Sequence, residues 1–203
     1  MTLRPVDVLR FRARRAALDR TAATPHDVID AVAALHGTDP ATVHLAVWAR
    51  TPVRPIDAVA ADVQAAHEDR SVVQVLAMRR TLHVVPAEEV PAALGVAKAR
   101  LYGPQRRLLD QLLVDAGLVD AGDAEAAYRR LAEQVLDALT DEDLPSDALA
   151  ERVPDLARRV ARNADKPYGG MVPLNRHVLE AMGHEGLVVR ARPLGGWRRN
   201  SST

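Results

Sequence analysis

Three side chains that can take part in acid–base chemistry stand within four residues of this chain: His36, Thr38 and Asp39. An imidazole or a carboxylate can orient or deprotonate a water molecule, a carboxylate can stabilise positive charge that develops nearby, and a hydroxyl can hold the water. The same residues also form an ordinary helix start, because Thr or Asp is a favoured N-cap and Pro40 suits the first helical position. Two interpretations therefore stay open, a catalytic motif or a helix cap alone.

The motif lies between two expected helices of an N-terminal domain. Helical periodicity predicts helices over Val6–Leu18, from the cap at Thr24 to about Leu35, over Pro40–Arg50 and over Ile56–His67. A pair of strands then covers residues 72–85, and Pro86 ends the second strand. Helices followed by a β-hairpin are typical of a winged helix-turn-helix, and we expect Trp48 to lie in its core.

The second expected strand carries cations. Alternation places Arg79, Thr81 and His83 on one face and Arg80, Leu82 and Val84 on the other. Since Leu82 and Val84 are core residue types, we expect Arg79 and His83 to point outward and Arg80 to pair internally at the strand edge. His83 has two interpretations, a contact with DNA or the active site and a structural hydrogen bond.

A second winged helix-turn-helix is expected after connector helices. The connectors cover Ala87–Leu101, which Gly103–Pro104 should break, and then Gln105–Ala116 and Asp123–Leu139. Ser146 can cap Asp147–Arg152, Pro154 can start a helix through Arg162, and Met171–Met182 is the expected recognition helix. Strands at Leu187–Ala191 and Trp197–Arg199 would form the wing. The residue types suited to bases and phosphates here are Asn175, Arg176, Arg190, Arg192, Arg198 and Arg199, with His177 beside them; a solvated charged face is the alternative for Asn175 and His177.

Composition limits the class of protein. The 203 residues are 48% hydrophobic and 27% charged, contain no cysteine, and show neither a membrane-spanning apolar run nor a secretory signal. We therefore expect a globular cytoplasmic protein without disulfides, and its oligomeric state stays unknown. The formal net charge is zero, which argues against nucleic acid, but arginines gather at both ends of the chain. A genome rich in arginine codons would explain the same bias.

No cofactor or metal is expected. The histidines lack metal-ligand spacing, cysteine ligands are absent, and there is no Walker loop or GxGxxG motif. The expected partner is double-stranded DNA, without a membrane or a metal ion.

Residues 78–86, Met-Arg-Arg-Thr-Leu-His-Val-Val-Pro, follow a Leu-Ala-Val-Trp-Ala-Arg helix and the His36–Asp39 segment in a specific order. This order resembles the tandem winged-helix proteins that include bacterial alkylpurine DNA glycosylases, some of which unhook interstrand crosslinks. The resemblance covers residues 5–100 well and the rest more weakly. It implies a mainly helical fold with small β-hairpin wings, in which two winged helix-turn-helix units are joined by connector helices.

The resemblance also implies site residues. The family's motif lies at the positions of His36, Thr38 and Asp39, where an alkylated purine would be released without metal or nucleotide cofactor. Gly37 stands where a larger apolar residue is expected, and Asp39 where Gln or Glu is expected. A third winged helix and a small β-barrel normally follow in the family, so the resemblance implies a fragment or a shortened relative.

Three functions remain as alternatives at this point: a DNA glycosylase-like repair or self-resistance enzyme, a non-catalytic winged-helix DNA binder, and a protein-interaction module. The expected domains are residues 1–103, a connector at 104–140 and a second winged-helix unit at 141–203.

Overall fold

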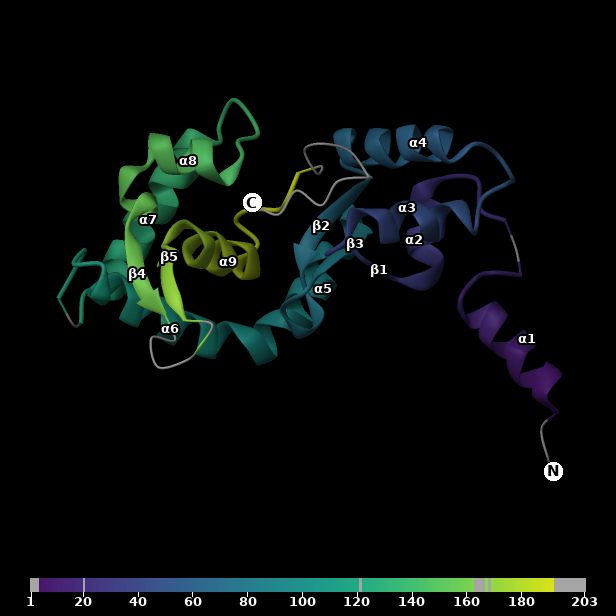
Figure 1. Cartoon of the computed structure of the whole chain (residues 1–203), viewed down its shortest axis with the longest axis horizontal. Helices are drawn as coiled ribbons and strands as arrows, with labels where there is room; N and C mark the ends of the chain where they lie inside the picture. The colour runs from purple at the N-terminus through teal and green to yellow at the C-terminus, as the bar shows by residue number, and fades with distance from the viewer. Residues whose placement is uncertain (1–3, 20, 121, 163–166, 168, 192–203) are drawn as a thin grey trace. The chain divides into compact units, whose positions relative to one another are not determined.

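The computed structural model describes residues 4–19, 21–120, 122–162, 167 and 169–191, without the side chains of Arg80 and Arg100. Two compact units make up this part of the chain (Figure 1). The first contains the described residues up to Val96 together with Val189–Ala191, and the second runs from Ala97 to Val188. The three-part domain organisation expected from the sequence stays a prediction.

The first unit begins with helices whose starts are determined by local sequence. Its helices are α1 (Pro5–Arg15), α2 (Pro25–Val32), α3 (Pro40–Trp48), α4 (Ile56–Glu68) and α5, which begins at Val90 and ends at Ala97. Thr24 and Asp27 form a capping box at α2, in which each side chain accepts the other residue's backbone N–H. The expected helix starts at residues 24–25 and 39–40 are therefore confirmed.

A three-stranded antiparallel sheet lies at the centre of this unit. Strand β1 (Leu35–His36) pairs with β3 (Leu82–Pro86), which pairs with β2 (Val72–Leu76), so the order is β1-β3-β2. The sequence predicted β2 and β3 but placed residues 35–36 at a helix end. Two residues are too short to show strand periodicity, and β1 exists because its backbone pairs with a distant strand.

Each face of the sheet packs against different helices (Figure 1). One face carries Val72 and Val84 into a core with α2, α3 and α4, whose fully buried members include Ile29 and Val47. The other face packs Val73, Val75 and Val85 against Val90, Ala93 and Leu94 of the α5 region. Burial of Leu35 in the same core as Val84 holds the short strand β1 in register beside β3, with Leu35 opposite Val84 and His36 opposite His83.

Trp48 departs from its expected place in the core. Its side chain is 43% exposed, and its indole N–H donates a hydrogen bond of 2.9 Å to the Arg54 carbonyl. The valines of α3 fill the core instead. Arg50 lies just beyond the end of this helix, where its guanidinium donates to the carbonyls of Ala46 and Ala16.

The second unit consists of helices around one hairpin. Its elements are α6 (Gly103–Asp115), α7 (Ala124–Ala138), α8 (Ser146–Arg152), β4 (Arg159–Arg162), β5 (Gly170–Pro173) and α9 (Asn175–Glu185). Leu109, Leu113, Leu131, Leu156 and Val178 are among its most deeply buried side chains. The mainly helical fold with small antiparallel hairpins is thus confirmed, and it is consistent with a winged-helix-like arrangement.

The hairpin of this unit was misplaced by sequence reasoning. The helix expected through Arg162 ends in a short 3₁₀ turn at Pro154–Ala157, and residues 159–162 form strand β4, which buries Val160 and pairs with β5. The helix expected from Met171 therefore begins only at Asn175. The wing expected after this helix is not confirmed. Leu187–Ala191 forms no strand and has only an isolated bridge between Arg190 and Gln74. The other expected strand, Trp197–Arg199, lies outside the described residues.

Two further local expectations were wrong. Gly103–Pro104 does not break the chain's helical course, because a π-helical turn at Lys98–Tyr102 leads directly into α6. Pro104 lies in the first turn of α6, where a proline is tolerated because the backbone N–H that it lacks has no partner within the helix. Ser146 is the first residue of α8 and does not cap it.

In the described part of the chain, no helix is both long and apolar enough to cross a bilayer.

Candidate functional site

The segment 36–39 lies where β1 passes into α3. The Gly37 N–H donates a 2.8 Å hydrogen bond to the Leu82 carbonyl, which extends the pairing with β3 by one residue. A Cβ atom on Gly37 would lie 3.2 Å from Val84 Cγ2 and 3.4 Å from Gln74 Nε2. With these neighbours in place, there is little room for a side chain at position 37.

His36 and Thr38 are brought together on the exposed side of this junction. Both side chains are exposed, and His36 Nε2 lies 3.5 Å from Thr38 Oγ1. The separation is at the outer limit of a hydrogen bond, so both groups retain capacity for a water molecule or a ligand.

His83 lies beside His36 on the neighbouring strand. The two rings meet edge to face, with centroids 5.6 Å apart and planes at 83°. The expected outward direction of His83 was wrong: its side chain is 7% exposed, and Nδ1 lies 3.0 Å from the Thr81 carbonyl. A carbonyl only accepts, so Nδ1 carries the proton and Nε2 is the acceptor in neutral His83. The structural hydrogen bond is therefore present.

Asp39 is the N-cap of α3. Its Oδ1 accepts the Ala41 N–H at 3.1 Å, and its Oδ2 accepts the Thr42 hydroxyl at 3.2 Å. The capping interpretation is confirmed. Because the side chain is exposed and each carboxylate oxygen can accept a further hydrogen bond, a chemical role stays a prediction.

The expected DNA contacts fall in different places. Arg79 is exposed in the turn between β2 and β3, where its φ of 56° and ψ of 24° are left-handed. The Arg80 side chain is outside the described part. Arg190 belongs to the first unit, where its N–H donates to the Gln74 carbonyl at 3.1 Å, and Arg192, Arg198 and Arg199 also lie outside the described residues.

The start of α9 presents only one of its candidate residues to solvent. Asn175 is 8% exposed and donates to the Ser146 carbonyl at 3.2 Å, while His177 is 1% exposed and lies 3.3 Å from Arg162. Their burial argues against the base contact expected for Asn175 and against a solvated face for either residue. Arg176 is exposed, so it stays a candidate for phosphate contact.

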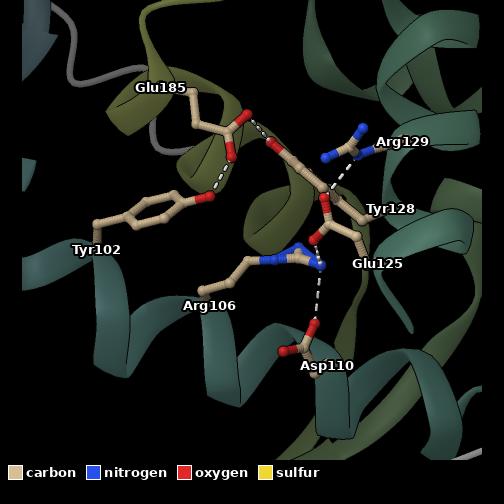
Figure 2. Close-up of polar contacts among 7 residues, drawn as sticks. All are labelled: Tyr102, Arg106, Asp110, Glu125, Tyr128, Arg129 and Glu185. Atoms are coloured by element: carbon tan, nitrogen blue, oxygen red, sulfur yellow. Dashed lines mark hydrogen bonds and ion pairs between the residues drawn. The ribbon is translucent and has the colours of Figure 1, made fainter. Parts of the chain in front are cut away.

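Sequence reasoning missed a polar cluster in the second unit, shown in Figure 2. The Glu185 carboxylate accepts hydrogen bonds from both Tyr102 and Tyr128, the latter at 2.8 Å. The Arg106 guanidinium lies over the Tyr128 ring, 4.2 Å from its centroid, and contacts Asp110 and Glu125, each at 2.9 Å. Only the one-turn spacing of Tyr102 and Arg106 was visible in the sequence, since Glu185 is distant along the chain.

The tyrosines of this cluster hold their protons strongly. Burial, then the Glu185 carboxylate, raises the pKa of Tyr102 to about 12, and the same causes raise the pKa of Tyr128 further. Both phenols therefore act as donors to Glu185 at neutral pH.

The described residues contain no group of three histidine, aspartate or glutamate side chains placed to hold a metal ion. The expectation of a reaction without a metal or a cofactor stays a prediction.

Comparison with known proteins relates this geometry to a family. Among curated proteins, none matches the sequence. The solved structure of the DNA glycosylase AlkZ from Streptomyces sahachiroi is similar over 96% of this chain, with a TM-score of 0.58 and 19% identity, which shows a shared fold. The chain spans about half of that protein, 48% of its length. A family model described as DNA glycosylase AlkZ-like matches residues 29–203, and the chain therefore belongs to the AlkZ-like DNA glycosylase family.

Proposed function

We propose that this protein binds double-stranded DNA and hydrolyses the N-glycosidic bond of N-alkylated purines, in repair or in self-resistance. The observation that carries the proposal is the exposed His36–Thr38 pair, 3.5 Å apart, at the start of α3 in a chain of this family. In this proposal the protein acts in the cytoplasm, its first domain bears the chemistry, and its second domain supplies further contacts with DNA.

The reaction needs little activation of the leaving group. An N7-alkylated purine already carries positive charge, so the bond between C1′ and N9 breaks with its electron pair returning to the ring. The water oxygen forms a new bond to C1′, and its proton passes to a base. The products are an abasic site and a neutral alkylated purine.

His36 is the base in this proposal, and Thr38 holds the attacking water beside it. Asp39 contributes negative charge near the sugar, where oxocarbenium character develops, while its oxygens cap α3. His83, which is buried and packs against the His36 ring, supports the direction of that ring in this proposal. Phosphate contacts come from Arg79 and Arg176, and from Arg80, Arg190, Arg192, Arg198 and Arg199 in the same proposal.

Base release from a duplex containing N7-methylguanine tests this function, with alkaline heating to reveal abasic sites. His36→Gln should lower the rate by about 100-fold or more, as expected for loss of a general base. Asp39→Asn should lower it as well while preserving the fold, because asparagine is also a good N-cap. His26→Gln is the matched control, since His26 is a partly exposed histidine of the same unit whose ring pairs with Glu88.

A non-catalytic DNA binder is the second candidate, and the capping bonds of Asp39 favour it. In that case the protein binds duplex DNA with an affinity that falls steeply with salt, and neither the wild type nor any variant produces abasic sites. Base release that is equal in the wild type and His36→Gln would contradict the proposed chemistry.

A further inference from the structure

The turn between β2 and β3 has an unusual backbone. Met78–Arg80 forms a single 3₁₀ turn, and the backbone of Arg79 adopts a left-handed conformation, which residues other than glycine rarely occupy. A non-glycine residue at such a position is retained when the surrounding structure requires it, and such residues concentrate at functional sites.

Thr81 fixes this turn from one side. Its backbone N–H and its hydroxyl both donate to the Met78 carbonyl, at 3.1 and 2.8 Å, and its own carbonyl accepts the Ala77 N–H at 3.2 Å. The direction of the turn is therefore set by three hydrogen bonds close to Met78.

The turn presents an apolar side chain next to a cation. Met78 is 52% exposed, and Arg79 is exposed as well. Among the residues that the structure describes, Arg79 has no ion-pair partner. A methionine is long, unbranched and apolar, and side chains of this kind insert between DNA base steps, while an arginine binds phosphate.

The same strand connects the turn to the candidate site. Leu82, which follows Thr81 directly, accepts the Gly37 N–H, and His83 is the next residue and packs against His36. A group inserted at the turn would thus act within a few residues of the proposed chemistry.

We propose that Met78 is a DNA-inserting residue: it enters the base stack beside the damaged nucleotide and occupies the space that the nucleotide vacates, while Arg79 binds the adjoining phosphate. This inference rests on the proposed function. An enzyme must expose the C1′–N9 bond of a stacked purine, and filling the vacated space keeps that nucleotide out of the stack.

The test uses a duplex in which 2-aminopurine flanks a 2′-fluorinated N7-methylguanine, whose glycosidic bond resists hydrolysis. Wild-type protein should raise 2-aminopurine fluorescence on binding. Met78→Ala should lose most of that rise, Met78→Leu should keep it, and Val53→Ala should leave it unchanged, because Val53 is another exposed apolar residue of the same unit, at 100% exposure. Arg79→Gly, which fits the left-handed backbone, should reduce the slope of log affinity against log salt by about 1.

An equal fluorescence rise in the wild type and Met78→Ala, or no rise in a wild type that binds the duplex, would overturn the inference. Base release from N7-methylguanine without the 2′-fluorine tests the proposed function separately from the insertion. If release depends on His36 but fluorescence does not depend on Met78, only the insertion is wrong. If fluorescence depends on Met78 without any release, insertion holds and the glycosylase activity is wrong.

Discussion

The two units contain polar clusters of opposite character. In the first, His36, Thr38 and Asp39 are exposed, and His36 and Thr38 share one long contact of 3.5 Å. In the second, Tyr102 and Tyr128 donate hydrogen bonds to Glu185, while Arg106 lies over the Tyr128 ring and pairs with Asp110 and Glu125. Groups that satisfy each other stabilise a fold, while groups with unused capacity at a surface can bind a substrate. The difference is the basis on which we propose chemistry for the first cluster and a structural role for the second.

The largest expected effect on this comparison comes from Glu185→Ala. The change removes the acceptor of two phenols, one of them on the buried Tyr128, and leaving buried donors unpaired should lower the free energy of unfolding by about 2 kcal/mol. Urea unfolding followed by circular dichroism measures it, with Glu133→Ala on the exposed face of α7 as the control. If the two variants were equally stable, the Glu185 cluster would have no structural role. If Glu185→Ala folded but released no base, chemistry would not be confined to the first cluster.

The second expected effect is a different pH sensitivity of the two units. Burial lowers the pKa of His44 and, together with the charge of His44, that of His67 in the first unit. At acidic pH these two histidines are protonated more readily in the unfolded chain than in the folded unit. The first unit should therefore lose stability as the pH falls below about 6.5. In the second unit the raised pKa of Tyr102 has the reverse sign: its contribution is complete below about pH 10 and is lost as the pH rises towards 12.

Hydrogen exchange measured by mass spectrometry resolves the two units separately. Peptides of α3 and α4 should lose protection first on acidification, after correction for the intrinsic exchange rate, and those of α6 and α9 first at alkaline pH. His67→Gln should remove part of the acid sensitivity. Simultaneous loss of protection in both units at both extremes would show that these groups do not control their stability.

Local signals were the part of the fold that sequence could predict. The Thr24–Pro25 and Asp39–Pro40 starts were read correctly because a cap and a proline act within one helical turn. The strands β1 and β4 were missed because each is short, and its stability comes from pairing with a distant strand and not from its own composition. Met171–Pro173 was assigned to a helix for the same reason.

In the candidate site, too, local features could be predicted from the sequence, and contacts between distant segments could not. The positions of His36, Thr38 and Asp39 came from a pattern along the chain, and so did the cap. The burial of His83 could not be predicted, because it lies beside Val75 on the face of the sheet that residues of the distant α5 region cover. The burial of Asn175 is not visible in the sequence, because its hydrogen-bond partner Ser146 lies 29 positions away.

Gly37→Ala has the smallest expected effect on stability. It tests whether the positions of His36 and Thr38 can change while the free energy of unfolding does not. In Gly37→Ala, reduced entropy of the unfolded chain favours the variant by about 0.4–1 kcal/mol, while the new Cβ would lie 3.2 Å from Val84 Cγ2. These terms oppose each other, so the free energy of unfolding should change by less than about 1 kcal/mol. The control Gly95→Ala lies in α5 with no atom within 4 Å of the new Cβ, and it should stabilise the protein.

Activity should respond to Gly37→Ala more than stability does. Relief of the 3.2 Å contact requires either the Val84 side chain or the β1 backbone to shift by a few tenths of an ångström. His36 and Thr38 are the residues on either side of position 37, so a backbone shift would move both. Catalytic groups act only within narrow limits of distance and angle, so base release should fall several-fold while the unfolding midpoint scarcely moves. Unchanged release in Gly37→Ala would mean that the spacing of β1 and β3 does not set the position of His36, and would weaken the assignment of chemistry to this cluster.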